Sequence, residues 1–344
     1  MQGLIIGGNE GTRLRPLTIY TPKPVIQIVD RPFLSYQLDI LKSLNISDVI
    51  LTIGYQSNKI EDIFGNGLER GIQLKYITES SPLGTAGTIR HAQADIGETL
   101  VVINGDVLTD IDLTGAVEFH KEKGSMVTVI LTPEGTASAF GIIELDSDGR
   151  VTTIHEKHRS DDHGLHSYSA GIYIIEPSVL KLIPEGEKHS LEFQLIPKLI
   201  ESGHPVFACP SHGHWIEFDT PQKYLQANID MICGLIGTTE IERPRAELPA
   251  PEGEAAQIDR NSYIHPDTII KPGAVILNSV ISANCHIEER ARIEYSVLLP
   301  GARVGKSTEV RGAIIGKGVI IGRFARIHST VLGDKSSLTD YSII

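Results

Sequence analysis

Short β-type runs, most of them rich in apolar residues, recur along the first third of the chain. They are "LII" (4–6), "DVILTI" (48–53), "QLKYIT" (73–78) and "TLVVIN" (99–104). Each run has the length of a strand and is bounded by polar residues or glycine. The pattern therefore predicts buried β-strands at these positions.

Segments of helical periodicity lie between these runs. The segment "FLSYQLDILKSL" (33–44) places Leu34, Leu38 and Leu41 on one face, and "SNKIEDIF" (57–64) begins with Ser57, a favourable N-cap residue. Strands that alternate with helices predict an α/β fold with a mostly parallel sheet covered by helices. Ligands of such sheets bind beyond the carboxyl ends of the strands.

The hydrophobic pattern changes near residue 238. The segment "TTEIERPRAELPAPEGEAAQ" (238–257) is rich in Pro, Glu and Ala, and it marks a linker. Apolar residues then recur every six positions, with register slips: Ile258, Ile264, Ile270, Ile276, Ile281, Ile287, Ile293, Val304, Val310, Ile321 and Ile327. This period fits neither a helix nor a hairpin sheet, but it is typical of hexapeptide repeats that wind a parallel β-helix.

We therefore expect three parts: a domain at 1–234, a linker at 235–257 and a hexapeptide-repeat domain at 258–344. Stacked coils of this kind tend to associate through exposed faces, so we expect a homo-oligomer formed through the β-helix.

Composition narrows the possible partners. The net charge of −12 gives no support to a nucleic-acid or anionic-membrane partner, although a phosphorylated small molecule needs only a few local cations. The three cysteines are widely spaced and form no C-x-x-C pattern. We therefore expect buried or unreactive thiols in a reducing compartment. No signal-peptide pattern and no apolar run of bilayer length occurs, so we expect a cytoplasmic protein.

A loop rich in glycine and arginine, "GGNEGTRLRP" (7–16), follows the first predicted strand. This combination indicates a phosphate-binding loop. It matches neither G-x-x-x-x-G-K-[ST] nor G-x-G-x-x-G, so the loop holds phosphate by another arrangement.

An ordered series of motifs covers nearly all of residues 1–230. They are "GTRLRPLTIYTPKP" (11–24), "ESSPLGTAG" (79–87), "NGD" (104–106), "FG" (140–141), "HEK" (155–157), "AGIY" (170–173) and "WIEFDTP" (215–221). In order and spacing this series resembles the sugar-1-phosphate nucleotidylyltransferases. Together with the hexapeptide repeats, it is similar to the mannose-1-phosphate guanylyltransferase subgroup. The resemblance implies a Rossmann-like mixed, mostly parallel sheet followed by a left-handed parallel β-helix.

The resemblance also implies a reaction. An enzyme of this family joins a sugar 1-phosphate to a nucleoside triphosphate with Mg²⁺ and releases pyrophosphate; mannose 1-phosphate and GTP are the substrates we expect. By resemblance, Arg13 binds the β- and γ-phosphates, Lys23 lies near the reacting phosphates, and Asp106 holds Mg²⁺. Glu217 aligns with the second metal-binding aspartate of the family.

The same resemblance assigns the binding residues. Those for the nucleotide are Gly8, Asn9, Gly11, Thr12, Glu79, Gly84, Thr85 and Gly87. Those for the sugar phosphate are Gly141, Glu156, Lys157, Ser169 and Gly171.

Four positions depart from the family pattern. Asn9 stands for a glycine, unless it is an insertion and Gly8 takes the glycine's place; Ser169 replaces an asparagine, Glu217 an aspartate and Asp219 a glycine. These departures leave open a regulatory or sensing paralogue that binds nucleotide sugar without making it.

A hexapeptide acyltransferase is the less favoured third possibility, because its candidate bases, His265, His286 and His328, are isolated. The histidine-rich stretch "HEKHRSDDHGLH" (155–166) is interpreted as a solvated loop rather than a metal site.

Overall fold

A computed structural model describes residues 1–8, 11–54, 56–79, 81–133, 136, 138, 140–155, 167–237 and 255–344. These residues form two compact units, and both units are discontinuous in sequence. Unit 1 lies within 1–10, 22–25 and 34–217, and unit 2 within 11–21, 26–33 and 218–344.

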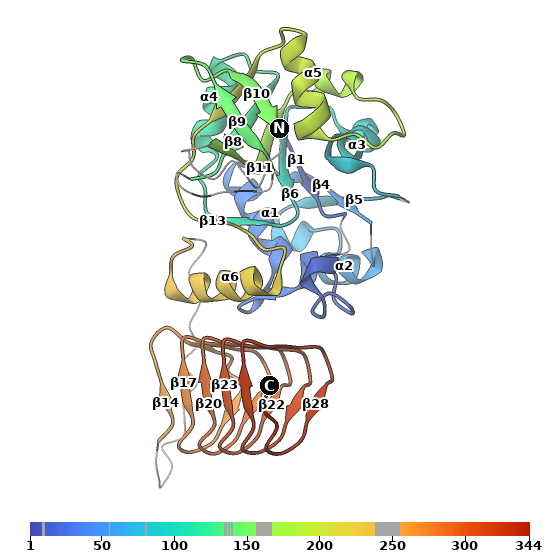
Figure 1. The fold of residues 1–344 in the computed structure, drawn as a ribbon. Coiled ribbons are helices and arrows are strands. Elements are labelled where there is room, and N and C mark those ends of the chain that lie inside the picture. Colours follow the sequence, from blue (N-terminus) through green and yellow to red (C-terminus); the bar gives the residue numbers. More distant parts are fainter. Residues whose placement is uncertain are drawn as a thin grey trace. The chain divides into compact units, whose positions relative to one another are not determined.

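The described strands of unit 1 form a nine-stranded sheet in which β10-β9-β11-β6-β1-β4-β5 lie side by side and β8 joins β11 to β12 (Figure 1). Parallel pairs join β1 (Gln2–Ile6) to β4 (Asp48–Ile53) and β6 (Leu100–Asn104), and β4 to β5 (Gln73–Thr78). The long β11 (Ser167–Ile175) runs antiparallel to β6, β8 (Val127–Leu131) and β9 (Ile142–Leu145). The pairs β9–β10 and β8–β12 complete it, with β10 at Val151–His155 and β12 at Val206–Cys209. The mixed, mostly parallel sheet is confirmed.

Helices cover both faces of this sheet. They are α1 (Phe33–Ser43), α2 (Ser57–Phe64), α3 (Gly84–His91), α4 (Thr114–Glu122) and α5 (Ile196–Glu201). Short 3-10 turns lie at Lys23–Val25, Leu68–Arg70, Gln93–Asp95 and Pro177–Leu182, and a π-helix lies at Leu191–Leu195. The N-cap expected at Ser57 is wrong, because Ser57 is already the first helical residue and Gln56 precedes it with a φ of 50°.

The core explains why the strand runs lack polar alternation. In β6, Val101 and Ile103 join one hydrophobic cluster, and Leu100 and Val102 join the other. Both faces of the strand are therefore buried, and every position must be apolar. Leu38 and its helical neighbours pack into the first cluster, as the helical spacing predicts.

Unit 2 contains a parallel β-helix built from three five-stranded sheets (Figure 1). One sheet consists of β14 (Gln257–Ile258), β17 (Val275–Leu277), β20 (Arg292–Glu294), β23 (Glu309–Arg311) and β26 (Arg326–His328). The second consists of β15 (Tyr263–Ile264), β18 (Val280–Ile281), β21 (Val297–Leu298), β24 (Ile314–Ile315) and β27 (Val331–Leu332). The third consists of β16 (Ile269–Ile270), β19 (His286–Ile287), β22 (Arg303–Val304), β25 (Ile320–Ile321) and β28 (Ser337–Leu338). The β-helix is confirmed, and the stacked parallel strands are consistent with left-handed winding.

The structure defines the number of residues in each coil of the β-helix, which the sequence pattern only suggested. Residues that are 17 positions apart stack in adjacent coils, as the main-chain bond from Ser296 to the Ser279 hydroxyl illustrates. Ile276, Ile293, Val310 and Ile327 form one such column. The first coil, from Ile258 to Ile276, spans 18 residues. From Ile276 onward each coil contains two intervals of six residues and one of five, and the five-residue interval is the register slip.

Unit 2 also includes parts of the N-terminal third of the chain. These are the segment Gly11–Thr21, with a 3-10 turn at Thr12–Leu14, and the hairpin of β2 (Gln27–Ile28) and β3 (Arg31–Pro32). Helix α6 (Pro221–Cys233) lies against this hairpin, since Asn228 Oδ1 accepts a 2.8 Å bond from the main chain at Val29. Lys317 Nζ of the β-helix donates to Thr21 Oγ1 at 3.1 Å.

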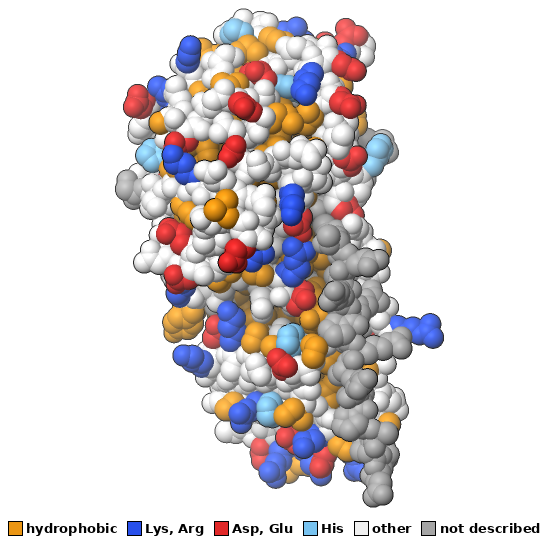
Figure 2. Space-filling model, turned by 180° about the vertical axis from the view of Figure 1, so that it is seen from behind, with side chains coloured by type: hydrophobic (Ala, Val, Ile, Leu, Met, Phe, Trp, Pro, Cys, Tyr) orange, Lys and Arg blue, Asp and Glu red, His pale blue; other side chains and the backbone are white. Residues whose placement is uncertain are grey.

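The molecular surface mixes charges of both signs. On the face drawn in Figure 2, acidic and basic side chains are interspersed rather than gathered by sign. Among the described residues, no helix has the length and apolar character needed to cross a membrane.

Candidate functional site

A pocket opens in unit 1 where β1 and β6 end. It holds about 580 Å³ of empty space, including its open mouth, and is lined by Ile6, Gly7, Lys23, Thr85, Asn104, Gly105, Asp106, Phe140, Glu192 and Phe193. Its position at the carboxyl ends of parallel strands is where sheets of this class bind ligands.

Close approach of the main chain shapes the floor of the pocket. The amide of Gly105 donates to the carbonyl of Ile6 at 2.9 Å, and a Cβ atom on Gly105 would lie only 2.4 Å from that oxygen. Only glycine fits between the two strand ends. This contact fixes the positions of Asn104 and Asp106 on either side of it.

Lys23 and Asp106 form an ion pair within the pocket. Lys23 Nζ lies 3.6 Å from Asp106 Oδ2, and their side chains are 7% and 17% exposed. The second carboxylate oxygen, Oδ1, is buried and has no hydrogen-bond partner among the described residues, and the same holds for Oδ1 of Asn104. The pocket thus presents two oxygen acceptors that a cation or a donor group of a ligand can use.

Glu217 lies beside Asp106 in the local strand pairing. Strand β13 (Trp215–Glu217) runs antiparallel to β7 (Val107–Thr109), and Glu217 stands opposite Val107, the residue after Asp106. Asp106 lies in the turn that precedes β7, and Glu217 is only 4% exposed. Among the described residues, no three or more His, Cys, Asp or Glu side chains are grouped to hold a metal ion, so further ligands would have to be phosphates and water.

Glu192 is a pocket residue that the sequence analysis missed. It is 4% exposed, and its Oε1 accepts a bond from the Tyr173 hydroxyl at 2.8 Å. Its Oε2 accepts from the hydroxyls of Thr85 at 2.8 Å and Ser190 at 2.9 Å. Burial and the nearby Glu192 raise the pKa of Tyr173 well above its ordinary value, so Tyr173 stays a hydrogen-bond donor. The motif "SLEFQL" gave no signal for this role, because a glutamate in a helical pattern is usually solvated.

The predicted sugar-binding residues divide between the pocket and the layer behind it. Ser169 is fully buried, and its hydroxyl contacts the Tyr173 hydroxyl at 3.0 Å and accepts from the amide of Gly171 at 3.2 Å. The assignment of Ser169 to the sugar phosphate stays a prediction. Gly171 has a φ of 67°, and a Cβ there would meet the pocket residues Phe140 and Asn104. Gly141 is the neighbour of Phe140, and a Cβ on it would lie 3.4 Å from Phe193.

The glycines of "ESSPLGTAG" pack against protein rather than face open space. A Cβ on Gly84 would lie 2.7 Å from the carbonyl of His189, and one on Gly87 would lie 2.7 Å from that of Glu187. This packing gives a structural reason for both glycines, and their assignment to the nucleotide stays a prediction. Glu79 is buried, with its Oε1 unpartnered among the described residues. A Cβ on Gly8 would lie 3.9 Å from Glu79 Oε2.

The signature segment of unit 2 begins with Gly11, which has a φ of 61° and precedes the 3-10 turn that starts at Thr12. The Thr18 hydroxyl donates to the carbonyl of Gly11 at 2.7 Å and holds the turn closed. Arg13 leaves this turn with a side chain that is 71% exposed. The residues Asn9, Glu156, Lys157, His158, His163 and His166 lie outside the described residues.

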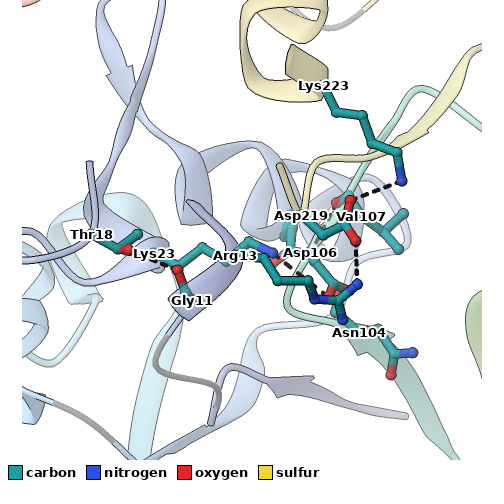
Figure 3. Close-up of polar contacts among 10 residues, drawn as sticks. Gly11, Arg13, Thr18, Lys23, Asn104, Asp106, Val107, Asp219 and Lys223 are labelled. Atoms are coloured by element: carbon teal, nitrogen blue, oxygen red, sulfur yellow. Dashed lines mark hydrogen bonds and ion pairs between the residues drawn. The ribbon is translucent and has the colours of Figure 1, made fainter. Parts of the chain in front are cut away.

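Asp219, the residue that departs from the family glycine, binds two cations in unit 2 (Figure 3). Its Oδ2 lies 2.5 Å from Arg13 Nη1, and its Oδ1 lies 2.8 Å from Lys223 Nζ. Burial favours the neutral acid, but the bond and charge of Lys223, together with the charge of Arg13, outweigh it and lower the pKa of Asp219. The carboxylate is therefore ionised at neutral pH.

Comparison with known proteins identifies both parts of the chain. The family described as "Nucleotidyl transferase" matches residues 2–232, and the family described as "GMPPB C-terminal domain" matches residues 258–344.

Relatives span nearly the whole chain. A "Mannose-1-phosphate guanylyltransferase" of Mycobacterium tuberculosis is 30% identical over 88% of this chain and 81% of its own length. A "UTP--glucose-1-phosphate uridylyltransferase" of Synechocystis is also 30% identical, over 94% of this chain and 88% of its own. "Mannose-1-phosphate guanylyltransferase 1" of Arabidopsis thaliana is 31% identical over 99% and 93%. Relatives with different bases and sugars in their names thus reach similar identity.

Proposed function

Because this chain belongs to the nucleotidyl transferase family, we propose that it joins a sugar 1-phosphate to a nucleoside triphosphate, releases pyrophosphate and forms a nucleoside-diphosphate sugar. The observation that carries the proposal is the pocket of unit 1, in which Lys23 and Asp106 face each other at the carboxyl ends of parallel strands. A cation and a carboxylate with a spare oxygen are the groups that phosphoryl chemistry requires.

The sugar and the base we propose are mannose 1-phosphate and GTP. The matching C-terminal family and relatives named as mannose-1-phosphate guanylyltransferases support this choice. The uridylyltransferase relative makes UTP with glucose 1-phosphate the pair to test against it.

Mg²⁺ is the metal that we propose for Asp106 and Glu217. The buried Oδ1 of Asp106, which has no hydrogen-bond partner among the described residues, fits a hard cation, which binds oxygen ligands. Glu217 is assigned to the same cation from the sequence resemblance. When bound, the cation would offset the charge of the phosphate oxygens.

The chain's own cations bind and orient the phosphates. The reaction brings one anion against another, so positioning and positive charge are the main requirements. Lys23 is held in the pocket between Pro22 and Pro24, and we assign it to the reacting phosphates. Arg13 is assigned to the β- and γ-phosphates, for which the planar guanidinium is suited.

We retain the remaining assignments as parts of this proposal. Gly8, Asn9, Gly11, Thr12, Glu79, Gly84, Thr85 and Gly87 contact the nucleotide, and Gly141, Glu156, Lys157, Ser169 and Gly171 contact the sugar phosphate. The Ser169 hydroxyl also contacts the Tyr173 hydroxyl and accepts a bond from the amide of Gly171.

A mixed-substrate assay tests the function. Purified protein is incubated with Mg²⁺, four nucleoside triphosphates and a panel of sugar 1-phosphates, and the product is identified by mass. We expect GDP-mannose and pyrophosphate, with loss of both in Asp106→Asn. Absence of pyrophosphate with every substrate pair would refute the proposal.

A regulatory paralogue is the second candidate, and the contact between Arg13 and Asp219 favours it, because Arg13 is already paired with an internal anion. Calorimetry that detects nucleotide-sugar binding, together with undetectable turnover, would support this alternative.

We further propose that the chain forms homo-oligomers through the β-helix. Light scattering coupled to size exclusion tests this: a monomeric mass across micromolar concentrations would contradict it. The proposed domain boundaries at 234 and 258 make up a second, separate statement. Limited proteolysis tests the second, with cleavage expected between 235 and 257.

A further inference from the structure

We propose that Arg13 and Lys223 form a two-cation binding site for phosphate groups, and that Asp219 is the resident anion of this site, which phosphate displaces. The assignment of the incoming anion to a triphosphate rests on the proposed function. The geometry rests on contacts within unit 2 alone.

The three side chains form an ordered arrangement rather than a chance contact. Asp219 uses one oxygen for each cation, with Oδ2 on Arg13 at 2.5 Å and Oδ1 on Lys223 at 2.8 Å. Arg13 and Asp219 are 206 residues apart in sequence. Figure 3 shows Asp219 between the two cations, which converge on it from different segments.

The three side chains differ in solvent exposure, and this difference determines which of them an incoming anion meets first. The Asp219 side chain is only 11% exposed, whereas those of Arg13 and Lys223 are 71% and 45% exposed. An anion that arrives from solvent therefore meets the two cations before it meets the carboxylate. The two oxygens of a carboxylate are spaced much like two oxygens of a phosphate group, so cations arranged around one can bind the other.

Little free energy is lost when a phosphate group replaces the Asp219 carboxylate as the partner of Arg13. Ion pairs with exposed partners contribute little to stability, because water and salt screen them and long side chains lose freedom. Arg13 can therefore leave Asp219 when a phosphate offers equal or greater charge. The carboxylate holds two cations together that would otherwise repel each other, and it competes with the phosphate that they bind.

Removal of the resident anion should therefore strengthen phosphate binding. For Asp219→Asn and Asp219→Gly we expect a Kd for phosphate about threefold lower than that of the native chain, the change that follows from loss of one screened charge contact. For Lys223→Gln we expect a Kd about threefold higher. Asp219→Glu retains the carboxylate and should stay close to the native value.

The test is calorimetric titration of the full-length protein with inorganic tripolyphosphate, without metal. Glu289→Gln is the matched control, because Glu289 is an exposed carboxylate of the same unit, 2.6 Å from Lys306, and its removal changes the net charge equally. We expect no change in Kd for this control. Circular dichroism of each variant, compared with the native spectrum, confirms that the fold is retained.

An unchanged or higher Kd in Asp219→Asn would overturn the proposal, and so would an equal decrease in Glu289→Gln. The outcome is separable from that of the proposed function. Stronger tripolyphosphate binding in Asp219→Asn, with no pyrophosphate released by the native chain from any substrate pair, would preserve the anion site and refute the reaction. Turnover by the native chain with unchanged binding in Asp219→Asn would do the reverse.

Discussion

The buried ion pair of Lys23 and Asp106 should show strong energetic coupling. A double-mutant cycle of Lys23→Met, Asp106→Asn and the double variant measures it, because the cycle isolates the pairwise contribution. At 3.6 Å and an effective dielectric constant of about 20, the attraction between unit charges is about 5 kcal/mol. Burial of two charged groups offsets much of this gain.

We therefore expect a coupling of about 2 kcal/mol, with each single variant destabilised by about 3 kcal/mol. Each single variant should lose more than half of the free energy of unfolding that the double variant loses, because each single substitution removes the opposite charge from a buried charged group. The pair is mostly enclosed, with side chains 7% and 17% exposed, so screening by water reduces the coupling only slightly.

The single tryptophan provides the assay. Trp215 is buried in unit 1, where its Nε1 donates to the carbonyl of Ala170 at 2.9 Å. Its fluorescence in urea therefore reports the unfolding of this unit and not of the β-helix. The matched control is a cycle on the more exposed pair of Lys75 and Asp95, also in unit 1, for which we expect less than about 0.5 kcal/mol. A coupling below that value for Lys23 and Asp106 would refute the reasoning.

Three other measurements test the structure. Gly105→Ala should lower kcat at least about tenfold and destabilise unit 1 by about 3 kcal/mol, because the added Cβ would meet the Ile6 carbonyl. Gly97→Ala is the control and should change neither quantity, because a Cβ on Gly97 would have no atom of the packed structure within 4 Å. Burial lowers the pKa of His120, against the opposing effect of its bond to Glu176, so the folded state favours the neutral ring. The free energy of unfolding measured by calorimetry should therefore be fully retained above about pH 6.5 and fall below it. The variant His120→Gln should flatten this pH dependence. Chelation by EDTA should abolish pyrophosphate release and Mg²⁺ should restore it; activity that persists in EDTA would contradict the metal assignment.

The strands were predictable where both faces are buried. The runs 48–53 and 99–104 contain β4 and β6, because a continuous apolar run of strand length has few other interpretations. In the β-helix, the six-residue spacing predicted the architecture but not the coil length. Leu298 and Ile315 follow their predecessors after five residues, so they fall out of phase with a strict six-residue period.

The interior of the candidate site was less predictable. Glu192 approaches Thr85 from 107 residues away, and Asp219 approaches Arg13 from 206 residues away. Such contacts depend on how loops fold back in space, and local pattern carries no information about them. The sequence did indicate that Asp219 departs from the family glycine, but only the structure shows the two cations that it binds.

The composition of unit 2 has a consequence for biosynthesis. The segment that carries Arg13 is among the first to leave the ribosome, yet Thr21 receives its bond from Lys317, which is synthesised 296 residues later. At about 5–20 residues per second, this separation corresponds to a delay of roughly 15–60 s. During that interval unit 1 can assemble while the arginine-bearing loop still lacks its support. A nascent chain that is interrupted before the last coils would therefore carry the signature residues without the bond that Lys317 donates to Thr21.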